Sequence, residues 1–168
     1  MAVDTPIIAT ASPEGERFTP TPISSAFSML LVALARHIEA DRDIENVDHW
    51  DPAFRQWLTA AEDALDAVMR LIHSIRREDP IRFEDRPLLR MTLLIDAMIC
   101  SDDPREFMRL HHLLPRFEPL FRCPGETATT RRVDRMLVTA RTRIDELATL
   151  DAYGDTPASE FVTTAAPA

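Results

Sequence analysis

A heptad repeat of apolar side chains between residues 54 and 75 is the feature that most restricts what this chain can fold into. Its seven members are spaced alternately four and three residues apart: Phe54, Leu58, Ala61, Leu65, Val68, Ile72 and Ile75. This spacing places them all on one face of a long α-helix, and other helices must cover that face. Asp51-Pro52 is a helix-start signal and Asp79-Pro80 is a stop. We therefore predict a long helix of an antiparallel bundle.

Four further segments also have helical spacing. The first begins at Ser24 or Ser25 and is apolar on nearly all sides, which indicates a central helix with several neighbours. A strongly apolar segment follows Pro87, a short one starts at residues 103–104, and the last starts within residues 127–130. The sequence thus predicts an all-α fold, a single-domain antiparallel helical bundle of four to five helices.

The two ends of the chain are expected to be disordered arms. Residues 1–23 contain four prolines among small and polar residues, and the end of the chain is again rich in alanine, threonine and proline. Such segments bury too little apolar area to offset the entropy lost on ordering. We therefore predict a disordered arm over 1–23, a helical bundle domain over 24–153 and a disordered tail over 154–168.

Composition excludes several classes of function. All 19 basic residues of the 168 are arginine. Without lysine, a Walker-type phosphate loop, a Schiff-base enzyme and a pyridoxal site are ruled out, because each needs a lysine amine. The net charge of −9 repels a phosphate backbone, so nucleic acid is not an expected partner.

No segment of the sequence predicts export or a membrane span. Residues 1–18 lack the basic start and apolar stretch of a signal peptide. The longest apolar block, residues 26–35, is much shorter than the roughly 20 residues that a spanning helix needs. Two cysteines imply no disulfide framework. We expect a cytoplasmic protein without a membrane partner, and the lysine-free usage, rich in alanine and arginine, is typical of a GC-rich bacterial genome.

Charge is unevenly distributed along the chain. Residues 39–66 contain nine acidic residues and two arginines, whereas residues 105–143 contain nine arginines and four acidic residues. The simplest interpretation is two differently solvated faces. The alternative is an oriented contact with a charged partner.

Metal and acid–base sites have little support. Glu45, Asp48 and His49 would share one face of a helix and offer three ligands to a divalent ion, but we interpret this acidic stretch as a solvated loop or helix end. Di-iron bundles need Glu-x-x-His motifs, and the chain has none. His111 and His112 are interpreted as a boundary pair, one facing inward and one outward. We expect no metal and no cofactor.

The stretch His73-Ser74-Ile75-Arg76 resembles the phosphoacceptor stretch His-Ser-Leu-Lys-Gly of histidine phosphotransfer domains. Arg77 stands where those domains have a glycine that lets a partner's aspartate approach. The resemblance implies a helical bundle with an exposed His73 as phosphoacceptor and Arg76 beside the phosphoryl oxygens. We favour the alternative, a surface histidine without chemistry.

The stretch from Leu113 to Phe121 is apolar although Pro115 and Pro119 interrupt its helical pattern. Loops rarely carry so many large apolar residues unless something covers them. The stretch is either a lid on its own bundle or a docking surface. As a docking surface it would consist of Leu113, Leu114, Arg116, Phe117, Leu120, Phe121 and Arg122.

These features together favour a non-catalytic helical-bundle protein that acts through protein–protein contacts, as an adaptor, a regulator or a dimerising accessory protein. The partner is another protein or a second copy. Self-association is the first expectation, because the acidic region 39–66 of one copy could face Arg116 and Arg122 of another. A phosphotransfer module using His73 is the alternative. An exposed apolar patch would favour the first reading, and a polar pocket or an exposed His73 the second.

Overall fold

The computed structural model describes residues 18–45, 50–101 and 103–154, and the expected arms lie mostly outside these ranges. Within them the chain is helical and contains no strand, which confirms the predicted all-α fold. The elements are α1 (Pro22–Glu45), α2 (Phe54–Arg77), α3 (Asp85–Ile99), α4 (Pro104–Leu113), the 3₁₀ helix η1 (Leu114–Phe121) and α5 (Ala128–Leu147).

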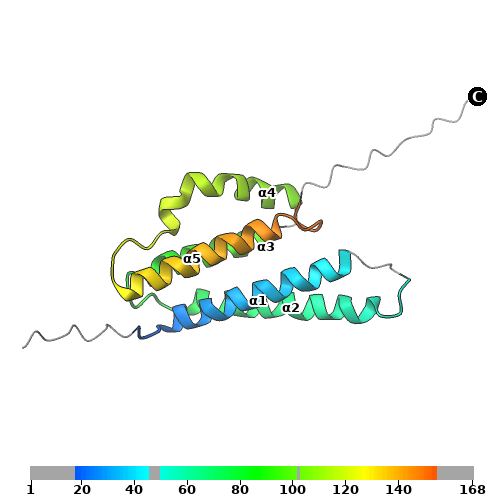
Figure 1. The fold of residues 1–168 in the computed structure, drawn as a ribbon, viewed down its shortest axis with the longest axis horizontal. Coiled ribbons are helices and arrows are strands. Elements are labelled where there is room, and N and C mark those ends of the chain that lie inside the picture. The colour runs from blue at the N-terminus through cyan, green and yellow to red at the C-terminus, as the bar shows by residue number, and fades with distance from the viewer. Residues whose placement is uncertain (1–17, 46–49, 102, 155–168) are drawn as a thin grey trace, which may run out of the picture.

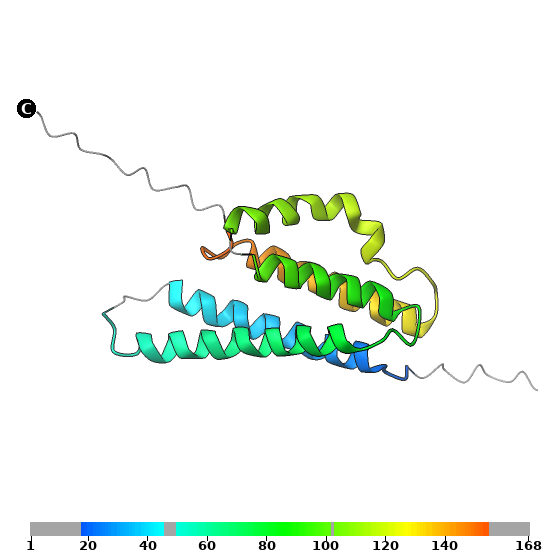
Figure 2. The same ribbon diagram turned by 180° about the vertical axis from the view of Figure 1, so that it is seen from behind.

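The helices form three layers (Figures 1 and 2). An antiparallel pair, α1 and α2, makes one outer layer, α3 and α5 lie on this pair, and α4 with η1 covers α3 and α5 on the far side. Successive α-helices run in opposite directions, so α1 and α5 pack side by side in parallel. In this arrangement the other described helices cover the α1–α2 pair on one face only.

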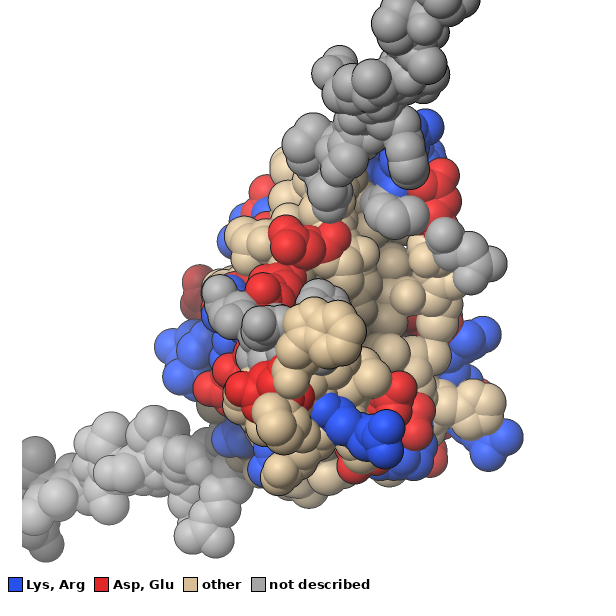
Figure 3. Space-filling model, turned by 90° about the vertical axis from the view of Figure 1, so that its right-hand side faces the viewer, with Lys and Arg blue, Asp and Glu red and all other residues tan. Residues whose placement is uncertain are grey.

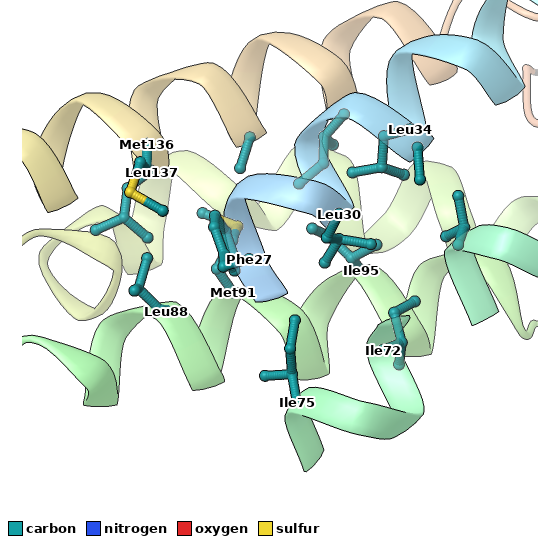
Figure 4. Close-up of a cluster of buried hydrophobic side chains, with 14 of the residues drawn as sticks. Phe27, Leu30, Leu34, Ile72, Ile75, Leu88, Met91, Ile95, Met136 and Leu137 are labelled. Atoms are coloured by element: carbon teal, nitrogen blue, oxygen red, sulfur yellow. The ribbon is translucent and has the colours of Figure 1, made fainter. Parts of the chain in front are cut away.

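The core lies between the α1–α2 pair and the α3–α5 layer (Figure 4). Each of the four helices α1, α2, α3 and α5 contributes large side chains that are almost completely buried. They include Phe27, Leu30 and Leu34 of α1, Ile72 and Ile75 of α2, Leu88, Met91 and Ile95 of α3, and Leu137 of α5. Phe107 of α4 joins the same cluster. Burial of this apolar surface is the main force that holds the helices together.

Two of the predicted helix starts are confirmed by their capping hydrogen bonds. Asp103 caps α4, because its carboxylate accepts the backbone N–H of Arg105 at 2.9 Å, and Pro104 follows at the first helical position. The Thr127 hydroxyl caps α5 by accepting the backbone N–H of Thr130 at 3.1 Å.

The predicted start of the first helix at Ser24 or Ser25 is wrong, because α1 begins at Pro22. The Thr21 hydroxyl accepts the Ser24 N–H at 3.1 Å, and the Ser24 hydroxyl accepts the Thr21 N–H at 2.8 Å. This reciprocal pair satisfies two backbone donors at the helix start, and Pro22 has no donor to satisfy. The first helix therefore starts within the segment that we expected to be a disordered arm.

Asp85 joins the start of α1 to the connection between α2 and α3. Its carboxylate is buried and accepts a hydrogen bond from the Thr21 hydroxyl. It also accepts the backbone N–H groups of Ile81 and Arg82, each at 3.0 Å. A buried carboxylate needs such partners to offset its desolvation. The third helix begins at Asp85 and so includes Pro87, after which we expected it to start.

The large side chains of the heptad repeat are buried only along the second half of α2, and in the first half Ala61 is buried. Val68, Ile72 and Ile75 are buried, whereas Leu65 is half-buried and Leu58 is 40% exposed. The first half of α2 is less buried because α2 is longer than its partners, and its start projects beyond the ends of α3 and α5 (Figures 1 and 2). The helix itself starts at Phe54 rather than at Pro52, after a turn in which Asp51 accepts the Ala53 N–H at 2.8 Å.

Because burial differs along α2, two substitutions to aspartate on its heptad face should cost different amounts of stability. Ile72→Asp would bury an unpaired charge and is expected to cost about 4 kcal/mol or more of the free energy of unfolding, enough to unfold a marginal domain. Leu65→Asp can reach water and is expected to cost about 1–2 kcal/mol. Urea titrations followed by far-UV circular dichroism measure both. Equal unfolding midpoints for the two variants would contradict this account of α2.

Candidate functional site

An open groove of about 860 Å³ runs along the α1–α2 pair. It lies on the face turned away from α3 and α5, because Met29, Val32 and Arg36 are about half a helical turn from the buried Leu30 and Leu34. The apolar lining comes from Met29, Val32, Ala33 and Ala40 of α1 and from Ala60, Ala64, Ala67 and Leu71 of α2. The groove is therefore an apolar face that the described helices of the bundle leave open.

The sequence forms this groove by combining large and small side chains. The alanines at 60, 64 and 67 of α2 are four and three residues apart, so they form a second stripe beside the heptad repeat. Their methyl groups leave space between the helices, whereas Met29 and Val32 of α1 stand at the edge with 54% of their surface exposed. The apolar character of α1 on nearly all sides was the signal for this groove, although we interpreted it as a central helix with several neighbours.

Four charged side chains also line the groove. Arg36 lies near its middle, while Glu39, Asp43 and Asp63 lie toward the end where α1 finishes and α2 begins. All four side chains are exposed. Figure 3 views the molecule from this end and shows acidic side chains gathered over the centre of the face, with most arginines toward its edges. The groove thus combines an apolar floor with a negatively charged end.

By length and composition, α1 would also be able to cross a membrane, with a mean hydropathy of 1.3 over its most apolar window. Half of that window is buried inside the bundle. The apolar character of α1 is divided between a face in the core and a face in the groove. A core helix with a second apolar face meets the same criterion as a spanning helix.

The predicted docking surface between residues 113 and 122 lies on the opposite side of the molecule, in the α4–η1 layer (Figure 1). Its inner side is packed, since Leu114 is buried and Phe121 contacts the core. Two polar contacts also bind this segment to α3 and α5. The Arg90 guanidinium donates to the Leu120 carbonyl at 3.3 Å, and Arg141 pairs with Glu118 at 3.1 Å.

The outer side of the same segment remains exposed. Phe117 and Leu120 have 45% and 47% of their surface exposed, Arg116 and Arg122 are exposed, and Leu113 is half-buried. The two prolines fit this geometry, because Pro115 stands in the first turn of η1 and Pro119 has no N–H to donate to a continued α-helix. The segment is a lid on its inner side and offers two apolar side chains on its outer side.

The residues of the phosphotransfer alternative lie on the solvent side of α2. His73 is exposed. Arg76, one turn further along, forms an ion pair with Asp96 of α3. The histidine is accessible, but the guanidinium that would bind phosphoryl oxygens already has a carboxylate partner.

A polar cluster is buried where α1 meets the C-terminal turn. His37 Nε2 lies 2.9 Å from Tyr153 Oη, and His37 Nδ1 lies 3.4 Å from the carboxylate of Asp41. The Tyr153 ring packs on Phe107 with 5.0 Å between ring centroids. Burial lowers the pKa of His37 below its usual 6.5, although the Asp41 carboxylate acts in the opposite direction. Burial also raises the pKa of Asp41. The cluster holds residues 37 and 153 together, and sequence patterns gave no sign of it.

The other candidate nucleophile, acid–base and metal sites have little structural support. Burial raises the pKa of the Cys123 thiol to about 11, so this cysteine is a poor nucleophile. His111 contacts Asp145 at 2.9 Å while His112 is exposed. In the part of the chain that the structure describes, no group of three histidine, cysteine or carboxylate side chains could hold a metal ion. Asp48 and His49 of the proposed acidic set lie outside that part.

Comparison of the chain with protein-family models, with curated proteins and with solved structures finds no match.

The buried cluster predicts a pH dependence of stability. Below about pH 6.5 the unfolded chain binds a proton at His37, whereas the folded state resists it, so lowering the pH favours unfolding. The raised pKa of Asp41 has the opposite effect on stability, because the folded state binds a proton there more readily than the unfolded chain does, and this effect occurs at lower pH, where carboxyl groups titrate. Between about pH 7.5 and 5.5, His37→Gln should lose a few degrees less of its melting temperature than the wild type does.

Differential scanning calorimetry at several pH values measures this effect. His73→Gln is the matched control, because His73 is exposed and should keep the wild-type pH dependence. The assignment is wrong if His37→Gln and the wild type show the same pH dependence.

Proposed function

We propose that this protein acts by binding another protein, as an adaptor or regulator, and not by catalysis. The observation that carries the proposal is the α1–α2 groove. An apolar face bordered by charged side chains is the usual anatomy of a protein-binding surface. The lining residues of α1 extend from Ser28 to Asp43, about 22 Å along the helix axis, which is the length of about four helical turns.

The form of the groove favours a helix as the bound segment. It lies between two antiparallel helices, and its alanine stripe has the spacing of four and three residues that matches the ridge of another helix. Amphipathic helices dock into such grooves by side chains at i, i+3, i+4 and i+7. The exposed Phe117 and Leu120 support an interaction role by offering a second, smaller apolar patch.

Site-specific photo-crosslinking in cells tests this proposal. A photoreactive phenylalanine analogue at Val32, in the groove, is expected to give a covalent adduct of defined mass with a partner protein. The same analogue at Leu93 of α3 is the matched control, because Leu93 is 45% exposed, is apolar like Val32, and does not line the groove. Equal labelling from both positions, or none from Val32, would count against binding at the groove.

The exposure of His73 supports one second candidate, a phosphotransfer module. In that case the protein would accept phosphate from a receiver domain or a small phosphodonor as an acid-labile phosphohistidine. We expect no such product, because Arg76 is paired with Asp96 and Arg77 replaces the glycine of the resembling stretch. Incubation with phosphoramidate followed by mass spectrometry tests this. A label that His73→Gln abolishes and His112→Gln preserves would establish the second candidate instead.

A further inference from the structure

We propose that the segment bound in the α1–α2 groove is a basic amphipathic helix of a different protein. This inference rests on the proposed function and adds the chemistry of the partner. It follows from the charge of the groove, from the placement of that charge at one end, and from the position of the groove relative to the rest of the molecule.

The charge of the lining selects a basic partner. One arginine and three carboxylates line the groove, so its net charge is −2: Arg36, Glu39, Asp43 and Asp63. Outside this lining, the exposed charges of α2 include the carboxylates of Glu62 and Asp66 and the guanidinium groups of Arg55 and Arg70, so the charge of −2 is that of the lining alone. Complementary charge speeds association and penalises wrong partners, so an acidic helix would be rejected here.

The placement of the charge also orients the partner. Met29 and Leu71 lie at the apolar end of the groove, and Asp43 and Asp63 lie at the acidic end. A bound helix would therefore place its apolar stripe along the alanines of α2. Its lysine or arginine residues would be concentrated over Asp43 and Asp63.

A second copy of this chain fits the groove poorly. Two grooves facing each other would bring together two surfaces of charge −2, on molecules that each carry −9. Segment 113–122 of a second copy, which is apolar and exposes Arg116 and Arg122, has suitable chemistry, but it lies on the opposite face from the groove (Figures 1 and 2). Pairing η1 with the groove would join copies head to tail, which produces rings or open filaments. A different protein has neither restriction.

The test uses two model peptides of about 20 residues, enough for a helix of the length of the groove. Both have leucine at the a and d positions of a heptad, and the remaining positions are mainly lysine in one and mainly glutamate in the other. Fluorescence anisotropy with the full chain measures the dissociation constants. The lysine peptide should bind at least about tenfold more tightly than the glutamate peptide. It should also bind more tightly than a scrambled peptide of the same composition.

Charge reversal then locates the site. The double substitution Asp43→Arg with Asp63→Arg should weaken binding of the lysine peptide by about tenfold or more. Glu78→Arg with Asp79→Arg is the matched control, because it changes the net charge equally at exposed positions outside the groove. Met29→Ser with Val32→Ser should also weaken binding, since these exposed side chains provide much of the apolar contact. Circular dichroism checks that each variant is folded.

Each remaining outcome decides against the inference. Equal effects of the two charge reversals, or equal binding of the scrambled peptide, would show general attraction to an acidic protein. A dimer in light scattering that Val32→Arg dissociates would identify a second copy as the occupant. If neither peptide binds while Val32 crosslinks to a partner in cells, the proposed function stands and the basic helix is wrong.

Discussion

The need to cover α1 is the constraint on which the rest of the structure depends. This helix has apolar side chains around most of its circumference, and Phe27, Leu30 and Leu34 are completely buried by α2, α3 and α5. Of these, α3 and α5 lie on one side of the α1–α2 pair, so Met29 and Val32 on the other side remain in contact with water. The same property that makes α1 the centre of the core therefore leaves the bundle with an apolar outer face.

The periodicity of the sequence was sufficient to predict the helices but not the extent of their burial. The heptad repeat predicted α2, and the Asp-Pro signal predicted α4, because both are local patterns. Whether Leu58 is buried depends on where α3 and α5 end, which is a property of other segments. The start of α1 was missed for a different reason, since the Thr21 cap was hidden in a proline-rich segment that was interpreted as an arm.

The candidate site was less predictable than the fold. The prolines at 115 and 119 correctly indicated an interrupted apolar segment, but they did not distinguish the inward Phe121 from the outward Phe117. The groove depends on which side of α1 its neighbours choose, and no local pattern encodes that choice. The pair His37 and Tyr153 is separated by 116 residues, so only the tertiary structure brings it together.

The Asp85 carboxylate has a consequence for the order in which the chain can fold during synthesis. It receives hydrogen bonds from Thr21, 64 residues earlier, and from the turn just before it. The hydrogen bond that the Thr21 hydroxyl donates is therefore made only after α2 and the start of α3 have left the ribosome. Until then the α1–α2 hairpin exposes apolar surface on both of its faces, and transiently exposed surface of this kind favours aggregation.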